Sequence, residues 1–268
     1  MPHDDVHVDG TSGSPVLLLP GGAATSRGFF PGLVEALDGH RVISLDRPGT
    51  GLASERGTAS LPSGSSAAAD AIRQLDAGPA VVVAQSLGGA VAVQLAMDHP
   101  EVVAGLVLID PTPVDLPELA PLLRRVFALL GLPGRLPVLG PRLDLLVWRA
   151  LGMRAKVAQE ARGAYDVMIR SATLHTTSKA VASLQGDVTA LAPRLRPLDV
   201  PVVIVTADRK QGDKVRQSHE RLAGTLGGRI VAPPGAVHAE HLRDPRSIHD
   251  LVLKVLAEVS VASGGKGP

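Results

Sequence analysis

The chain has 268 residues, of which 45% are hydrophobic and 20% charged, and its formal net charge is +1. This length suits one α/β domain with an inserted subdomain, and the balanced charge does not favour nucleic acid or an acidic membrane surface as a partner. The absence of cysteine excludes disulfides, thiolate catalysis and cysteine-based metal sites. We expect no cofactor, no metal and no membrane span. The polar N-terminus is unlike a signal peptide, so a cytoplasmic protein is expected.

Short apolar runs alternate with helix-like segments through much of the chain. Residues 15–19 form an almost continuous apolar run, which is typical of a strand buried on both faces of a sheet. Residues 6–8 are a candidate edge strand. The other predicted strands are 41–45, 80–85, 105–110, 200–206 and 229–232, with helical spacing at 30–37 and 67–75. This alternation predicts an α/β fold, with a mostly parallel central sheet and helices on both faces.

The alternation stops between residues 111 and 197, where the pattern is helical and is broken by proline and glycine. The predicted helices are 119–130, 142–151 and 154–174. An all-helical insertion between two parallel strands cannot be a simple crossover, so we expect a helical lid over the carboxyl edge of the sheet. The expected division is a first part of the core at 1–110, the lid at 111–197, a second part of the core at 198–259 and a disordered Gly/Ser-rich tail at 260–268.

The apolar faces of the predicted lid have two interpretations of equal weight. They could line a substrate pocket, with Leu123, Val126, Leu130 and Trp148 as the substrate-binding candidates. They could instead only pack against the main domain.

The stretch 80–96 is the centre of the predicted chemistry. A β-branched run ends at Gln85, Ser86 follows at once, and a small-residue helix pattern begins directly after it. A strand, a sharp turn with a serine at its tip and a helix are the context of a nucleophile elbow. The strained turn requires small neighbours two residues before and after the serine, and these are Ala84 and Gly88. The usual motif has glycine at the first of these positions. Alone, the pattern also fits an ordinary strand-to-helix turn.

A serine hydroxyl is a poor nucleophile near neutral pH, so it needs a base, and the base needs an orienting acid. The base is expected on a loop after the last strand, where His238 and His241 compete. The loop that begins at Gly235 favours His238, because a flexible turn can bring its imidazole back to Ser86. His241 begins a predicted helix. The remaining histidines in helix-like patterns or at a helix end are interpreted as solvated: His99, His219 and His249.

Three aspartates are candidates for the acid. Asp208 follows the strand 200–206 and Asp110 ends the strand 105–110, so both stand at a carboxyl edge from which a histidine can be reached. Either of them could also be an ordinary helix cap or turn residue. Asp213 is a third choice if the loop is long. We favour Asp208 and keep Asp110 as the alternative.

An oxyanion hole needs two hydrogen-bond donors. The Leu87 amide is one candidate, because amides at a helix N-terminus carry partial positive charge. The Gly22 amide, on the loop after the strand 15–19, is the other, and Gly21 allows close approach. A glycine-rich loop after a strand also suits phosphate binding. However, the stretch from Pro20 to Ala23 lacks the spacing of a dinucleotide or P-loop motif.

In this order and spacing, the motifs resemble the α/β-hydrolase family, specifically its lid-bearing group of small esterases and related hydrolases. The segments that carry the resemblance are 17–22, 46–51, 84–89, 99–103, 109–111 and 235–238. The resemblance implies Ser86 as nucleophile, His238 as base, and the Gly22 and Leu87 amides as oxyanion donors. A serine at the elbow argues against the epoxide hydrolases and dehalogenases of this fold, which use an aspartate there.

The family leaves the acid open. Its acid usually follows the strand where Asp208 lies, whereas some members carry it after the strand that ends at Asp110. Besides Ala84, the chain departs from the family pattern in its two N-terminal strands, which look much shortened between Val8 and Ser14, and at two further places. Pro20 stands where the family usually has a histidine that shapes the oxyanion loop, and Thr206-Ala207 stands where a glycine usually precedes the acid.

The sequence therefore predicts a serine hydrolase that acts on a small or medium apolar ester, amide or related acyl substrate through a Ser-His-Asp triad and an acyl-enzyme. Two alternatives remain open: a non-catalytic small-molecule binder on the same fold, and a cofactor-free C–C hydrolase, lyase or haloperoxidase that uses the same triad.

Overall fold

The computed structural model describes residues 5–76, 78–132, 146, 156–171 and 173–264. Within these residues a seven-stranded sheet has the strand order β1-β3-β2-β4-β5-β6-β7. The strands are β1 (Val6–Asp9), β2 (Pro15–Leu19), β3 (Arg41–Leu45), β4 (Ala80–Gln85), β5 (Val103–Ile109), β6 (Val202–Val205) and β7 (Arg229–Val231). Strand β1 pairs antiparallel with β3 at one edge, and the other pairs of this sheet are parallel. The predicted α/β fold class is confirmed.

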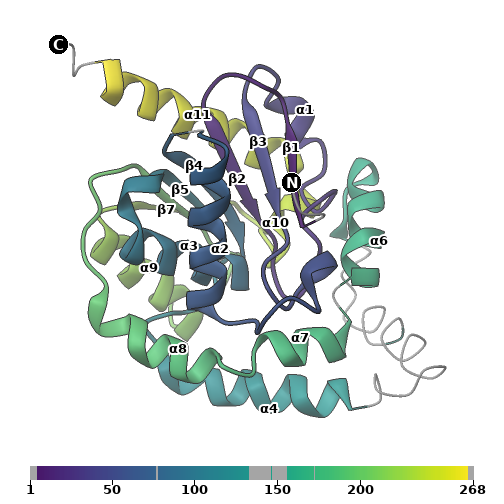
Figure 1. Cartoon of the computed structure of the whole chain (residues 1–268). Coiled ribbons are helices and arrows are strands. Elements are labelled where there is room, and N and C mark those ends of the chain that lie inside the picture. Colours follow the sequence, from purple (N-terminus) through teal and green to yellow (C-terminus); the bar gives the residue numbers. More distant parts are fainter. Residues whose placement is uncertain (1–4, 77, 133–145, 147–155, 172, 265–268) are drawn as a thin grey trace.

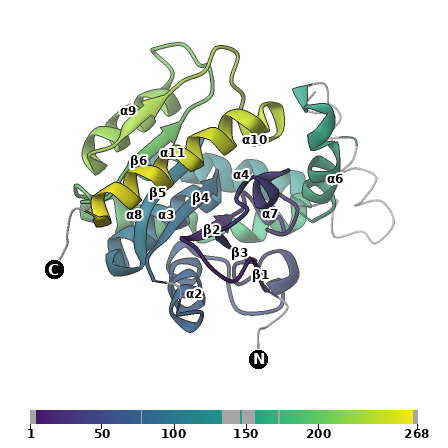
Figure 2. The ribbon, with the colours of Figure 1, turned by 90° about the horizontal axis from the view of Figure 1, so that it is seen from above.

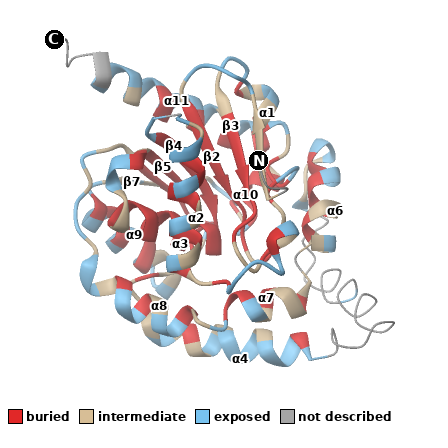
Figure 3. Cartoon of the chain, in the orientation of Figure 1, coloured by how far each residue is buried: buried red, intermediate tan, exposed pale blue. Residues whose placement is uncertain are grey.

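The central strands are apolar along their whole length because both faces of the sheet are covered (Figure 1). Every residue of β2, β4 and β6 is buried. Figure 3 shows this buried layer running through the middle of the molecule. The strands therefore form a rigid platform whose carboxyl ends can hold side chains in fixed positions.

Helices pack on both sides of the sheet, as the view from above in Figure 2 shows. The helices of the core are α1 (Leu33–Ala36), α2 (Leu61–Gln74), α3 (Leu87–Asp98), α9 (Lys214–Leu226), α10 (Glu240–Arg243) and α11 (Pro245–Gly264). Residues of α2, α3 and α9 belong to one hydrophobic core, and residues of α1, α10 and α11 belong to a second core on the other face. Helix α3 is buried from Leu87 to Met97, which its run of glycine and alanine permits.

The described residues between β5 and β6 are mostly helical. They include α4 (Ala120–Gly131), α6 (Arg162–Ser171), α7 (Leu174–Ala180) and α8 (Leu184–Leu191). The predicted helix 154–174 is shorter and begins as α6 only at Arg162. In Figure 1, α4, α7 and α8 lie across the lower end of the sheet. Helix α8 is attached to the start of α2 and to the loop before it. Asp187 Oδ2 accepts from the Leu61 amide at 2.9 Å, and Oγ of Ser183, the N-cap of α8, donates to the Ala59 carbonyl at 3.1 Å.

One predicted boundary needs correction. Helix α11 continues to Gly264, so the first residues of the predicted disordered tail are helical. The reason is that residues 260–263 can extend a helix that Val252 and Val255 anchor in the core. The predicted helix 142–151 lies outside the described residues, apart from Leu146. Among the helices of the described part, none is long and apolar enough to cross a membrane.

Candidate active site

Ser86 stands at the tip of a sharp turn between β4 and α3. Its backbone angles, φ 50° and ψ −117°, lie in a region that a residue with a side chain rarely adopts. Neighbouring backbone holds it there: the Ser86 amide donates to the Ile109 carbonyl at 3.0 Å, and the Ser86 carbonyl accepts from the Thr112 amide at 2.9 Å. The turn therefore has the strained backbone of a nucleophile elbow, as the residue pattern around Ser86 indicated.

The two glycines at the start of α3 allow this helix to sit tightly against its surroundings. A Cβ on Gly88 would lie 2.4 Å from the Leu19 carbonyl oxygen and 2.5 Å from that of Pro20. A Cβ on Gly89 would lie 2.6 Å from Pro111 Cβ. Both contacts are impossible for a real side chain, so the elbow depends on glycine at these positions.

The predicted oxyanion loop runs alongside Ser86. A Cβ on Gly21 would lie 3.1 Å from Ser86 Cβ, which brings this loop into contact with the serine. Gly22 has φ 51°, a conformation that favours glycine. The buried side chain of Arg47 supports the loop, because its Nη2 donates to the carbonyls of Pro20, at 3.1 Å, and Gly22, at 2.6 Å. Burial lowers the pKa of Arg47 to about 10, so at neutral pH it remains a cation.

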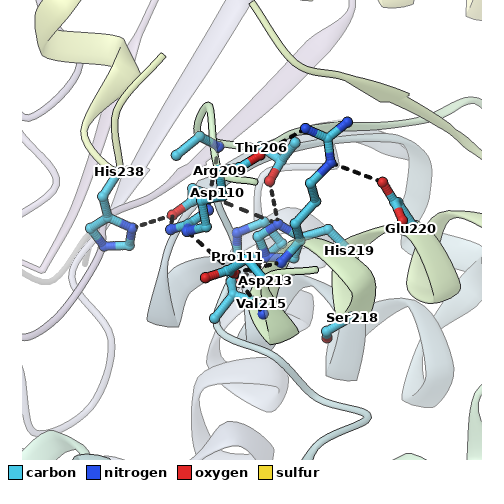
Figure 4. A network of polar contacts seen from close by, with 12 residues as sticks. Asp110, Pro111, Thr206, Arg209, Asp213, Val215, Ser218, His219, Glu220 and His238 are labelled. Carbon is cyan, nitrogen blue, oxygen red and sulfur yellow. Dashed lines mark hydrogen bonds and ion pairs between the residues drawn. The ribbon is translucent and has the colours of Figure 1, made fainter. Parts of the chain in front are cut away.

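The base candidate His238 lies beside Asp110, as Figure 4 shows. His238 Nδ1 is 2.5 Å from Asp110 Oδ2. Because a carboxylate only accepts hydrogen bonds, Nδ1 carries the proton and Nε2 is left as the acceptor of a neutral imidazole. The His238 side chain is 51% exposed, whereas the Asp110 side chain is only 2% exposed. A buried acid and an accessible imidazole are the arrangement that a triad needs.

Asp110 is held from several sides. Its Oδ1 accepts from the Ala207 amide at 2.9 Å, and the Arg209 guanidinium binds both carboxylate oxygens, with Nη2 at 2.6 Å from Oδ2. Its backbone φ of 42° is a left-handed conformation that aspartate tolerates better than most residues. Burial acts to raise the pKa of Asp110, but the hydrogen bonds from Arg209 and His238 hold it well below the usual range. Asp110 is therefore ionised at neutral pH.

The preference for Asp208 over Asp110 is corrected by these contacts. Asp208 is exposed, and its Oδ2 accepts from the Gly235 amide at 2.7 Å. It thus holds the loop that carries His238, while the imidazole itself pairs with Asp110. The sheet order explains the difference, because β5, which precedes Asp110, is the neighbour of β4, whereas β6 lies one strand farther away. Asp213 is the N-cap of α9 and accepts from two amides of its first turn.

Gln85 connects the elbow to the histidine loop. Its side-chain amide, Nε2, donates to the His238 carbonyl at 3.0 Å and lies 3.3 Å from His238 Nε2. The imidazole therefore faces Gln85 in this structure. Contacts between nucleophile and base are often long before substrate binds and tighten in the complex. Gln85 was not singled out from the sequence, where it fits equally well as an ordinary last residue of a strand.

Two histidines have surroundings that the sequence did not indicate. His219, expected to be solvated, is fully buried: Nε2 lies 2.8 Å from the Pro111 carbonyl oxygen and Nδ1 lies 2.8 Å from the Thr206 hydroxyl (Figure 4). His241 is also buried and stacks on Phe29 with 4.7 Å between ring centroids. His241 is therefore directed into the core, away from the role of base.

His249 is a smaller correction to the expectation of solvated histidines. Its Nε2 lies 2.9 Å from the Pro31 carbonyl oxygen, and it is partly buried there. Because a carbonyl only accepts, Nε2 must carry the proton in this contact. The ring thus attaches α11 to the loop before α1.

The three described substrate-binding candidates of the lid all lie on α4 and differ in their burial. Leu123 packs against the core on the α2 and α3 face. Val126 and Leu130, farther along α4, are 41% and 39% exposed. Trp148 lies outside the described residues. For Leu123, the structure favours a packing role, in a core to which both main-domain and lid residues contribute.

Comparisons with known proteins place this geometry in a family. A model described as the alpha/beta hydrolase fold matches residues 14–245. The chain belongs to the α/β-hydrolase family, which confirms the resemblance and the prediction of an enzyme of this fold. It is 28% identical to the esterase Rv0045c of Mycobacterium tuberculosis over 92% of this chain and 84% of that protein. It is 35% identical to the pimeloyl-(acyl-carrier protein) methyl ester esterase of Nitrosomonas europaea, over 40% of this chain and 42% of that protein.

Solved structures share the fold. The structure of MenH from S. aureus superposes with a TM-score of 0.77 at 17% identity, covering 96% of this chain and all of that one (100%). At this identity the likeness concerns the arrangement of the backbone only.

Proposed function

We propose that this chain is a serine hydrolase of small or medium apolar acyl substrates, with Ser86 as nucleophile, His238 as general base and Asp110 as acid. The observation that carries the proposal is the buried Asp110 carboxylate at 2.5 Å from His238 Nδ1, together with the contact of His238 with Gln85, which directly precedes a serine in elbow conformation. This contact fixes the tautomer in which Nε2 can accept a proton. The esterase names of two relatives support an ester as the substrate.

In the first step, Ser86 Oγ attacks the carbonyl carbon of the substrate while His238 Nε2 takes the hydroxyl proton. The carbonyl π electrons move to oxygen, and the amides of Gly22 and Leu87 stabilise the negative charge that forms there. The tetrahedral intermediate collapses and expels the leaving group, which receives the proton from His238. An acyl-enzyme and a free alcohol or amine result.

In the second step, water attacks the acyl-enzyme and gives its proton to His238 Nε2. The second tetrahedral intermediate releases the carboxylic acid, and the proton returns to Ser86 Oγ. Throughout, Asp110 stays ionised and stabilises the imidazolium form of His238. For Nε2 to engage the serine, its contact with Gln85 Nε2 must be given up, while the bond from Gln85 to the His238 carbonyl can remain and hold the loop.

The test is covalent labelling with a fluorophosphonate probe, which reacts with activated serines. We expect one adduct, on Ser86, in the folded protein, and none in Ser86→Ala. Turnover of a p-nitrophenyl ester by Ser86→Ala should fall by about three or more orders of magnitude. A folded protein that shows no adduct, or a variant with unchanged turnover, would overturn the proposal and favour a ligand-binding role on the same fold.

A further inference from the structure

We propose that Arg209 is a positioning residue for the triad. It binds the same carboxylate as His238 and offsets part of the negative charge of Asp110, so that the imidazole stays unprotonated, and able to act as a base, at lower pH. This inference rests on the proposed function and names a determinant of the pH range of that site.

The geometry of Arg209 differs from that of a surface ion pair. The guanidinium binds both oxygens of Asp110 in a fork, and Asp110 Oδ2 therefore receives Arg209 Nη2 at 2.6 Å and His238 Nδ1 at 2.5 Å on the same atom. The Arg209 side chain is only 23% exposed. Its backbone carbonyl accepts from Arg216 Nη1 at 2.9 Å, which holds the start of the loop in place. A bidentate pair of this kind is rigid and poorly screened by solvent.

Helix α9 presents two further groups to this pair. His219 Nδ1 lies 3.8 Å from Asp110 Oδ1, and burial lowers the pKa of His219, which keeps it neutral at pH 7. Asp213, the N-cap of α9, has Oδ1 at 3.8 Å from Arg209 Nε. The helix therefore places a neutral ring beside the carboxylate and a second carboxylate behind the guanidinium.

Arg243 on α10 is a further cation near the histidine loop, but its ion pair is with Glu240. Burial lowers the pKa of His241, on the same helix, to about 3. From β4, the Gln85 amide that contacts His238 carries no charge. Among the described residues, Arg209 is thus the cation that binds Asp110 at neutral pH.

A carboxylate that is bound only by its histidine stabilises the imidazolium form with its full charge. When a guanidinium binds the same carboxylate, part of that charge is offset, and the imidazolium gains less. The orienting role of Asp110 is kept, because the hydrogen bond to Nδ1 remains. The expected consequence is a base that stays unprotonated further into the acidic range than it would beside a free carboxylate.

The experiment compares Arg209→Gln and Arg209→Lys with the wild-type protein and with Arg221→Gln. Arg221 is a matched control, because it is an exposed cation on α9 that pairs with Asp115 instead of Asp110. Two measurements are made on each protein: the NMR titration of the His238 ring, and the pH dependence of kcat/KM for a p-nitrophenyl ester. The Ser86 adduct with the fluorophosphonate probe shows whether each variant is folded and competent.

We expect Arg209→Gln to move the midpoint of the His238 titration, and the acidic limb of the pH–rate profile, upward by about one pH unit. At a pH below that limb, kcat/KM should fall about tenfold, and at a pH well above it the change should be less than about threefold. Arg209→Lys should show a smaller shift, since a lysine keeps the charge but not the fork. Arg221→Gln should behave as the wild type.

An unchanged midpoint in Arg209→Gln would overturn the proposal, as would an equal loss of kcat/KM at every pH, which indicates a structural role only. The NMR titration needs no turnover, so it tests the Arg209–Asp110–His238 relationship even if Ser86 takes no label. Absence of the Ser86 adduct in the wild-type protein would instead overturn the proposed function. If Arg209→Gln does not fold, Arg209→Lys is used in its place. A His238 titration midpoint in Arg209→Lys equal to that of the wild type would then overturn the proposal.

Discussion

His238 Nδ1 and Asp110 Oδ2 lie 2.5 Å apart although the two residues are separated by 128 positions in the chain. Asp208, in contrast, accepts from the Gly235 amide of the histidine loop. We therefore expect Asp110→Asn to lower kcat for a p-nitrophenyl ester by about three to four orders of magnitude, because an amide favours the wrong tautomer of His238 and does not stabilise its cation.

Asp208→Asn is the matched control for this prediction. An asparagine oxygen can still accept from the Gly235 amide, so kcat should change by less than about threefold. Steady-state kinetics of the two variants, together with their melting temperatures, make the comparison. A severe fall in kcat for Asp208→Asn, together with a mild fall for Asp110→Asn, would reverse our assignment of the acid.

Arg47 is predicted to support the oxyanion loop, which begins at Pro20. Arg47→Met removes the hydrogen bonds to the Pro20 and Gly22 carbonyls. We expect kcat to fall about tenfold to hundredfold with little change in KM, since the loop loses the geometry that the oxyanion requires. Stability should change little, because burying a guanidinium whose Nε has no partner within the described residues is itself costly. A fall in melting temperature without an effect on kcat would contradict this role.

The tight contact of α3 with the oxyanion loop predicts a strong effect of one methyl group. Gly88→Ala places Cβ against the carbonyls of Leu19 and Pro20, so we expect the free energy of unfolding to fall by about 2–4 kcal/mol. Gly186→Ala, in α8, is the control, because a Cβ there meets nothing within 4 Å. It should raise the free energy of unfolding by about 0.5–1 kcal/mol. Urea denaturation of both variants tests the pair, and equal stability of the two would exclude the close packing.

His241 predicts how stability depends on pH. Burial lowers its pKa to about 3 in the folded protein, against an ordinary value of 6.5 for a solvated histidine. Between these values the unfolded chain binds a proton that the folded chain does not, so the free energy of unfolding falls as the pH falls below about 6.5. Between pH 7 and pH 5, this one histidine lowers the free energy of unfolding by about 2 kcal/mol.

His241→Phe should remove that part of the acid sensitivity, because a phenyl ring can pack against Phe29 and Phe30 without titrating. Urea denaturation of the wild type and of the variant at pH 7 and pH 5 gives the loss of unfolding free energy of each protein between these pH values. The wild type should lose about 2 kcal/mol more than the variant between these pH values. Equal losses in both proteins would show that the ring is not held neutral in the folded state.

Much of this protein follows from local sequence. The apolar runs of β2, β4 and β6 define strands covered on both faces, and Ser86 between a β-branched run and a small-residue helix defines the elbow. These features depend on residues close together in the chain, where steric limits and periodicity act directly. For the same reason, the glycine-led loop was enough to favour His238 over His241.

Only the tertiary structure decided which carboxylate meets His238. The choice between Asp110 and Asp208 depends on strand order and on the direction in which each side chain leaves its loop, and the sequence encodes neither locally. The roles of Gln85, Arg209 and Arg47 are of the same kind, since each donates to a segment far away in the chain. Long-range packing also buries His219, whose polar neighbours on α9 predicted solvent, because it lies on the face of that helix that is buried against the rest of the molecule.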